Sequence, residues 1–148
     1  MKYMRNEDDA KDVFQEAFVI VFQKIGQYKF EGSFEGWLKR IFINKLIETL
    51  NKKKKESFFL DVFDPDTDFV EEEELDIAPV EQEKLLEYIR DLPDQYRTVF
   101  NLYVFEKLKH KEIAELLKIS EGTSKSNLNR AKSILQKKIM SIKNFKIA

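Results

Sequence analysis

Cysteine is absent from this chain of 148 residues, and histidine and tryptophan occur once each. Without cysteine the chain can form neither a disulfide nor a thiolate metal site, and a cytoplasmic setting fits this composition. The sequence has no Gly-rich phosphate loop, no H-E-x-x-H and no G-x-S-x-G, so no catalytic constellation is present. We therefore expect neither an enzyme nor a bound cofactor.

Long hydrophobic runs are also missing. The longest apolar runs are far too short to span a bilayer, and no signal-peptide pattern opens the chain. Apolar residues nevertheless make up 43% of the sequence, which is enough for a core, and phenylalanine dominates the aromatic residues. We expect one domain or two small ones, without membrane insertion.

The net charge of −1 conceals a strong segregation of charge along the chain. Residues 1–55 hold 12 basic and 8 acidic side chains, and residues 92–148 hold 12 basic and 5 acidic ones. Between them, residues 56–91 hold 2 basic and 14 acidic side chains. Two basic blocks separated by an acidic one predict two modules that bind a polyanion, joined by a segment that repels it.

Two helices are predicted in the first basic block. The first runs from residue 6 or 7 to about residue 25, where Gly26 provides a stop. Its apolar positions recur at four-residue spacing and are Val13, Phe14, Ala17, Phe18, Val21 and Phe22. Asp12, Gln15 and Glu16 lie together on one side, where they could bind a partner or form an ordinary solvated face.

The second helix follows a short glycine-bearing loop at residues 30–33. Ser33 stands at the N-cap, and the lysines at 52–55 suit the C-terminal end of the helix dipole. The apolar face comprises Phe34, Trp37, Leu38, Ile41, Phe42 and Leu46. An aromatic-rich loop before a helix with a basic end suits single-stranded or melted nucleic acid. An ordinary core helix with a solvated face explains the same stretch, and on this stretch alone that second interpretation is favoured.

The acidic block indicates a connection between two domains. Residues 56–78 show little helical period, and seven acidic residues lie between positions 66 and 76, so we predict an acidic linker. Pro79 fits the first position of a helix that ends near residue 92. The predicted architecture is all-α, with one small helical domain at 1–55, the linker at 56–78 and a second helical domain at 79–148.

The second domain carries a helix-turn-helix pattern. Pro93 begins one helix, residues 111–117 form a two-turn helix, residues 118–120 a tight connection, and residues 121–139 a long final helix. Projected at 100° per residue, the final helix buries Ser124, Leu128, Ala131 and Leu135. Opposite lie Thr123, Ser126, Arg130 and Ser133, flanked by Asn127 and Asn129, with Lys125 and Lys132 nearer the border of the buried arc.

The polar face of this final helix suits DNA. Small hydroxyls and amides beside an arginine suit base-edge contacts in a major groove, and long lysine stems can reach phosphates. A solvated amphipathic helix would more often carry Glu–Lys pairs here, yet no acidic residue occurs between Thr123 and Ala148. That absence favours DNA binding over a solvated face.

Three stretches in this order resemble one protein family. They are DDAKDVFQEAFVIVFQKI at residues 8–25, FEGSFEGWLKRIFINKLIE at residues 30–48, and the stretch from LPDQYRTVF to LQKKI at residues 92–139. Separated by an acidic spacer and covering most of the chain, they are similar to the extracytoplasmic-function group of the sigma-70 family, bacterial transcription initiation factors.

The resemblance implies partners and site residues. The partners would be core RNA polymerase and promoter DNA, with an anti-sigma factor as a partner expected for the family, and with no catalysis by the chain itself. The polymerase clamp helices would contact Asp12, Gln15 and Glu16. The −10 element would be contacted by Phe30, Ser33, Phe34, Trp37, Arg40 and Asn44, although packing in the core explains Trp37 at least as well. The −35 element would be contacted by Thr123, Lys125, Ser126, Asn127, Asn129, Arg130 and Lys132.

The sequence departs from the family pattern in two places. The family normally carries one or two further helices ahead of the segment around Asp12, and without them the phenylalanines of the first helix lose part of their packing partner. A truncated product, an alternative start or self-association would account for this. In the last helix, Asn127 and Lys132 stand where arginine is common, so the preferred −35 sequence is expected to differ.

Two other functions remain open at this stage. The chain could be a stand-alone helix-turn-helix regulator that dimerises through its N-terminal half and reads palindromic half-sites. It could also be a shortened relative that binds polymerase or an anti-sigma factor without initiating. The single histidine, His110, is expected to be a surface residue at the start of a helix.

Overall fold

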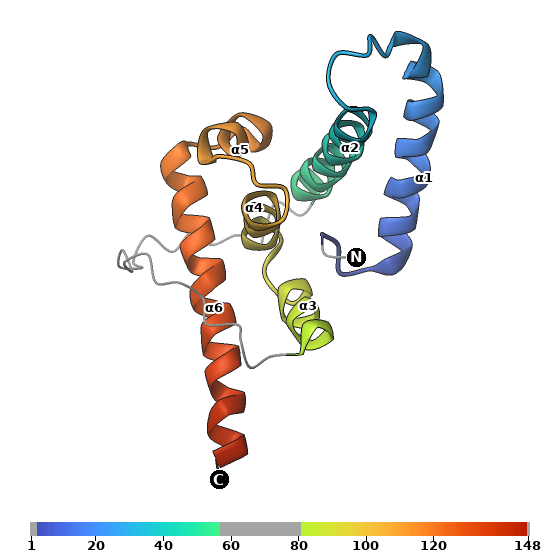
Figure 1. Cartoon of the computed structure of the whole chain (residues 1–148). Helices are drawn as coiled ribbons and strands as arrows, with labels where there is room; N and C mark the ends of the chain where they lie inside the picture. Colours follow the sequence, from blue (N-terminus) through green and yellow to red (C-terminus); the bar gives the residue numbers. More distant parts are fainter. Residues whose placement is uncertain (1–2, 57–80, 148) are drawn as a thin grey trace. The chain divides into compact units, whose positions relative to one another are not determined.

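The computed structural model describes residues 3–56 and 81–147, and every regular element within these ranges is helical (Figure 1). The elements are α1 (Glu7–Lys24), the short 3-10 helix η1 (Ile25–Gln27), α2 (Phe34–Glu56), α3 (Gln82–Arg90), α4 (Asp94–Val104), α5 (His110–Leu117) and α6 (Glu121–Ile147). The all-α prediction is confirmed. The predicted linker after residue 56 and the predicted helix start at Pro79 lie outside the described residues.

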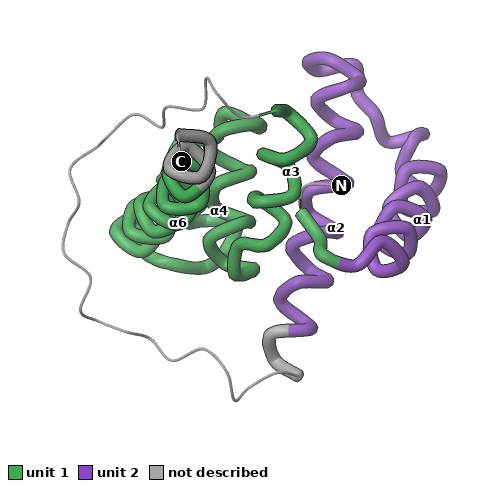
Figure 2. The backbone as a smooth tube through the Cα atoms, turned by 90° about the horizontal axis from the view of Figure 1, so that it is seen from below, with its two compact units in different colours: residues 1–5, 66–148 green, residues 6–65 purple. Residues whose placement is uncertain are grey.

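The chain divides into two compact units (Figure 2). One contains residues 6–65, and the other contains residues 66–148 together with residues 1–5. The chain therefore passes from one unit to the other twice, first at the junction of residues 5 and 6 and again between α2 and α3. None of the described helices is both long enough and apolar enough to cross a lipid bilayer.

The first unit is an antiparallel pair of helices, α1 and α2. The side chain of Asn6 accepts a hydrogen bond from the backbone N–H of Asp8 at 2.8 Å and caps α1. Ser33 caps α2 in the same way, because its Oγ accepts from the backbone N–H of Gly36 at 3.1 Å, as the sequence predicts. Across the pair, Lys45 binds Glu16 at 2.8 Å and Lys53 forms an ion pair with Asp9.

The two helices of the first unit bury one stripe of α1. Val13, Ala17 and Val21 are buried on α1, and Leu46 and Ile47 are buried on α2. Ala17 has no side chain beyond Cβ and is fully buried, so the two helices can approach each other closely there.

The neighbouring stripe of α1 is exposed. Phe14, Phe18 and Phe22 lie one position further around the helix, and Phe22 is 72% exposed. Phe14 and Phe18 contact the ring of Phe42 on α2, with ring centroids 5.2 and 5.4 Å apart. The six-residue apolar stripe predicted for this helix is thus two adjacent stripes. Within the described residues α2 buries the first and covers the second only in part, through Phe42.

In the second unit, α6 packs along α4 and α5. The predicted buried positions Ser124, Leu128, Ala131 and Leu135 are all buried, which confirms the projection of this side of the helix. The core is completed by Ile89, Leu92, Val99, Phe100, Leu102, Ile113 and Ile139. The helix α6 extends to Ile147, eight residues beyond its predicted end, because neither glycine nor proline occurs after Gly122 to stop it.

The turn between α5 and α6 has the geometry of a helix-turn-helix. Lys118 ends α5 in the left-handed conformation, with φ of 55°. Two residues later Ser120 accepts a hydrogen bond from the backbone N–H of Thr123 at 2.9 Å and caps α6. At the start of α5, the carboxylate of Glu112 accepts from the backbone N–H of Lys109 at 2.7 Å.

Candidate nucleic-acid interface

An aromatic cluster stands at the start of α2. It consists of Tyr28, Phe30, Phe34 and Trp37. The ring of Tyr28 lies 4.8 Å from Phe30, 5.5 Å from Phe34 and 5.3 Å from Trp37, measured between centroids. Phe34 and Trp37 are stacked at 5.6 Å. Phe30 is 85% exposed, and Phe34, the first residue of the predicted apolar face of this helix, is also exposed.

The loop that carries Phe30 has an unusual backbone. Phe30 has a φ of 58° and Gly32 a φ of 86°, both in the left-handed region. Glycine adopts this region without cost, whereas an L-residue such as phenylalanine pays about 1–2 kcal/mol. The hydroxyl of Tyr28 donates to the carbonyl oxygen of Gly32 at 2.8 Å and closes the loop. The loop therefore holds an aromatic ring out in solvent at a conformational cost, which is typical of functional loops.

The polar members of the predicted −10 set occupy two different environments. The hydroxyl of Ser33 is engaged by the backbone N–H of Gly36, so Ser33 positions the start of α2. Arg40 and Asn44 are exposed one turn apart on α2 and share a face. Trp37 is half-buried, consistent with both the packing and the binding interpretations of this residue.

The predicted polymerase-binding residues are exposed on α1. Asp12, Gln15 and Glu16 occupy adjacent positions of the same face. The hydrogen bond from Lys45 lowers the pKa of the Glu16 carboxyl below its usual range, and the charge of Lys45 acts in the same direction. The hydrogen bond to Glu16 in turn raises the pKa of Lys45. Glu16 is thus held against α2 and charged at neutral pH.

The predicted −35 residues of α6 differ in exposure. Lys125 and Ser126 are exposed, and Thr123, Asn129 and Lys132 are half-buried. Asn127 is only 6% exposed, so the buried arc of α6 is wider there than the projection indicates. The amide of Asn127 therefore does not face solvent.

Arg130 lies against α4. Its guanidinium donates a hydrogen bond to the hydroxyl of Tyr96 at 3.1 Å and lies 5.9 Å from the centre of that ring. Two hydroxyls of the predicted set are bound locally as well. Ser126 donates to the carbonyl oxygen of Thr123 at 3.0 Å, and the hydroxyls of Thr123 and Ser120 are hydrogen-bonded at 2.8 Å.

His110 has a structural role that the sequence did not reveal. Its Nδ1 is 2.9 Å from the buried Oγ of Ser124, and its ring stacks on Tyr103 with centroids 4.7 Å apart. This contact joins the first residue of α5 to the first turn of α6, and so helps fix the angle of the helix-turn-helix. His110 is half-buried, so its predicted placement on the surface is only partly right. Its position as the first residue of a helix gave no signal of a partner 14 residues away.

Comparison with known proteins places both units in one family. A family model described as sigma-70 region 2 matches residues 1–56, and one described as sigma-70, region 4 matches residues 82–135. The ECF RNA polymerase sigma factor SigW of Bacillus subtilis is 31% identical over 153 residues, covering 93% of this chain and 79% of that protein. The RNA polymerase sigma-H factor of Pseudomonas aeruginosa is 29% identical over 147 residues, covering 93% and 76%.

One solved structure supports the fold. The sigma factor RpoE of Bartonella quintana, solved in complex with the anti-sigma factor NepR, matches with a TM-score of 0.57 at 18% sequence identity, covering 92% of this chain and 84% of that one. At this identity the match shows the similarity of the fold. Together with the two family models and the sequence relatives, it establishes that the chain belongs to the sigma-70 family, in its extracytoplasmic-function group.

Proposed function

We propose that this chain is a promoter-specificity subunit that binds core RNA polymerase and directs it to promoters. The unit with α1 and α2 contacts the −10 element, and the helix-turn-helix unit contacts the −35 element. One observation carries the proposal: an exposed aromatic cluster and a helix-turn-helix occur on two separate units of one sigma-70 chain. This role places the chain with RNA polymerase in the bacterial cytoplasm, and it requires no catalysis by the chain.

The aromatic cluster is the proposed site for the melted −10 strand. Stacking of one base on an exposed aromatic ring contributes about 1–3 kcal/mol, and Phe30 offers such a ring to an unpaired base. Phe34 belongs to the same cluster, and the ring of Trp37 is stacked on the ring of Phe34. Arg40 and Asn44 continue the site along α2.

The N-terminal half of α6 is the proposed reader of the −35 element. Ser126 and Asn129 supply a hydroxyl and an amide for base edges, and Lys125 and Lys132 supply charge for phosphates. We propose that Arg130 also contacts a base, and its hydrogen bond to the hydroxyl of Tyr96 positions the guanidinium on this side of α6. We omit Asn127 from the proposed readers because it is buried.

Asp12, Gln15 and Glu16 form the proposed contact with polymerase. An exposed acidic face attracts a basic surface on a partner and steers the encounter. The ion pair with Lys45 holds the Glu16 carboxylate in place before binding, which lowers the conformational entropy that binding must remove.

The proposal is tested by transcription from a pool of genomic fragments with purified core polymerase. Polymerase with the chain is expected to start at a defined set of sites that share −35 and −10 sequences, whereas polymerase alone is not. The variant Phe30→Leu keeps an apolar side chain of similar size but removes the ring, and Phe30→Tyr keeps the ring. Loss of starts with Leu and retention with Tyr would support stacking. No chain-dependent start at any site would contradict the proposal.

A non-initiating role is the second candidate, and the exposed phenylalanines of α1 favour it. Phe14, Phe18 and Phe22 form an apolar stripe that a protein partner could cover. A chain that binds polymerase or an anti-sigma factor through this stripe without initiating would form a stable complex yet give no chain-dependent transcript. The same reaction, with complex formation measured in parallel, separates the two roles.

A further inference from the structure

Tyr28 is the member of the aromatic cluster that contacts all the others. Its ring lies within 5.5 Å of the rings of Phe30, Phe34 and Trp37, measured between centroids. Its hydroxyl also contacts the backbone, through the carbonyl oxygen of Gly32. All five residues belong to the first unit. Tyr28 was not among the residues that the sequence predicted for the −10 element, so its contacts point to a role that the sequence did not show.

The side chain of Tyr28 joins the two ends of the loop at residues 29–32, called here the Phe30 loop. The backbone N–H of Tyr28 donates to the carbonyl oxygen of Ile25 at 3.2 Å, which fixes Tyr28 at the end of η1. Its hydroxyl donates to the carbonyl oxygen of Gly32 at 2.8 Å. The next residue is Ser33, which caps α2. The hydroxyl of Tyr28 therefore ties the end of η1 to the start of α2.

The Phe30 loop needs such a tie because its own conformation is unfavourable. Phe30 has a φ of 58°, a region that an L-residue rarely adopts, and its ring is 85% exposed. Burial therefore contributes little to holding Phe30 in place. The ring of Tyr28, 4.8 Å from that of Phe30, and the hydrogen bond to Gly32 are the contacts that favour the closed loop.

We propose that Tyr28 is a positioning residue for single-stranded DNA, which holds the ring of Phe30 ready to stack on an unpaired base. This rests on the proposed function, in which the aromatic cluster binds the melted −10 strand. A loop that is open part of the time must close before it binds, and its apparent affinity falls by the fraction of closed loops. The hydroxyl of Tyr28 thus raises the affinity for DNA through Phe30, without touching the base itself.

The first measurement is made on the free full-length chain by NMR. A residue in the left-handed conformation gives a strong NOE between its own amide and α protons, and Phe30 is expected to show it. Tyr28→Phe keeps the ring and removes only the hydroxyl, so it should weaken this NOE and the NOEs between the rings at positions 28 and 30. The matched control is Tyr88→Phe, which removes a hydroxyl from α3 of the second unit and should change neither signal. Unchanged signals of Phe30 in Tyr28→Phe would overturn the proposal.

The second measurement compares two labelled oligomers of equal length by fluorescence anisotropy at low salt. Oligothymidylate carries bases, whereas an abasic oligomer carries the same phosphates without bases. Tyr28→Phe should weaken binding of oligothymidylate by up to about 10-fold, the net contribution of one neutral hydrogen bond, and leave binding of the abasic oligomer unchanged. Equal losses on both oligomers would show a general effect on the fold and contradict a positioning role. Equal affinity of the parent chain for both oligomers would contradict it as well.

A double variant tests whether Tyr28 acts through Phe30. In a Phe30→Leu chain, Tyr28→Phe should cause no further loss of oligothymidylate binding, and additive losses would reject the proposal. Gly32→Ala is the second route to an open loop, because the φ of 86° at this position disfavours a side chain although the space around it is empty. It should lower the affinity for oligothymidylate in the same way, and an unchanged affinity would count against the closed loop. These measurements need no polymerase, so their failure is distinguishable from a failure of the transcription assay.

Discussion

Phe30 combines an unfavourable backbone conformation with an exposed aromatic ring. Its backbone is in the left-handed region and its ring is almost fully exposed, so neither local geometry nor burial accounts for a phenylalanine at this position. A base stacked on the ring would account for both features. Tyr28 contacts this ring and closes the loop below it through Gly32.

The only tryptophan, Trp37, belongs to the same cluster, so its fluorescence reports a bound strand. Single-stranded DNA with the −10 sequence is expected to quench Trp37 in the free chain at low salt. Phe30→Leu should weaken this binding by about 5- to 150-fold, the equivalent of about 1–3 kcal/mol of stacking, and Phe30→Tyr should restore it. Equal affinities for the parent and Phe30→Leu would remove Phe30 from the site.

Arg130 is a second residue with a proposed role in promoter binding. Arg130→Ala is expected to cost about 1–3 kcal/mol of −35 binding and to relax the preference at one base position. Tyr96→Phe keeps the ring but removes the hydroxyl that holds Arg130, so it should leave the base preference intact. Selection of bound sequences from a randomised −35 pool measures the base preference of both variants. A preference that Arg130→Ala leaves unchanged would argue against this residue as a reader.

At the scale of elements, the helix pair of the first unit depends on close approach at Ala17. Ala17→Leu adds three carbon atoms where α1 meets α2 and is expected to destabilise the fold by about 1–3 kcal/mol. Val19→Leu, at an exposed position of the same helix, is the control and should change the stability by less than about 0.5 kcal/mol. Urea unfolding of the three proteins gives the comparison. Equal stabilities would mean that the helices do not pack at Ala17.

The ion pair between Glu16 and Lys45 makes the stability of the α1–α2 helix pair depend on pH. Lys45 lowers the pKa of Glu16 in the folded chain, so the pair stabilises the fold above the unfolded pKa, about 4.3, and this contribution is lost as the pH falls through the lower folded value. In Glu16→Gln, the free energy of unfolding should depend less on pH between about pH 5 and pH 3. Above this range the two proteins should show the same pH dependence of this free energy. Unfolding curves across that range test it, and identical pH profiles would contradict it.

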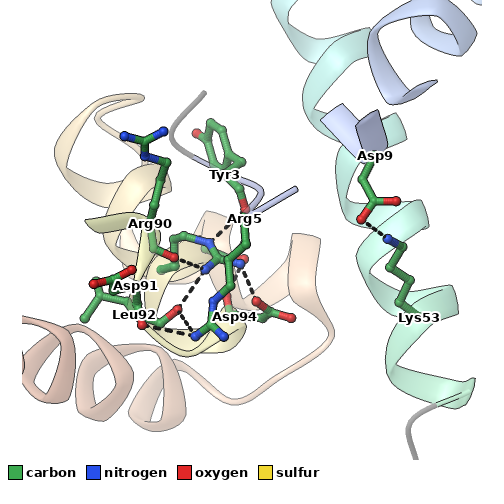
Figure 3. A network of polar contacts seen from close by, with 10 residues as sticks. Tyr3, Arg5, Asp9, Lys53, Arg90, Asp91, Leu92 and Asp94 are labelled. Atoms are coloured by element: carbon green, nitrogen blue, oxygen red, sulfur yellow. Dashed lines mark hydrogen bonds and ion pairs between the residues drawn. The ribbon is translucent and has the colours of Figure 1, made fainter. Parts of the chain in front are cut away.

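The elements also show what the sequence can and cannot specify. Helix starts depend on local chemistry, and Ser33 caps its helix as predicted. The sequence did not show which of the apolar residues of α1 are buried. Periodicity identifies the apolar residues, but not which of two adjacent stripes packs against another helix. The burial of Arg97 was not predictable for a related reason, since one of its acceptors, the carbonyl oxygen of Tyr3, lies 94 positions away in the sequence (Figure 3). On α6 the predicted buried residues are buried, but Asn127, which the projection places beside the polar face, is buried as well.

For the whole molecule, the central question is whether the two units contact one promoter at two places. Their charge supports this, because the blocks at residues 1–55 and 92–148 are both basic although the chain as a whole is nearly neutral. Electrostatic attraction to phosphate then acts on both units, and the affinity of each should fall steeply with salt.

The most direct measurement is a hydroxyl-radical footprint of core polymerase with this chain on a promoter found in the transcription assay. Two protected patches are expected, one over the −35 element and one over the −10 element. Ser126→Ala with Asn129→Ala should weaken the upstream patch alone, and Phe30→Leu should weaken the downstream patch alone. A single patch over a palindromic site, or a footprint identical to that of polymerase without the chain, would contradict it.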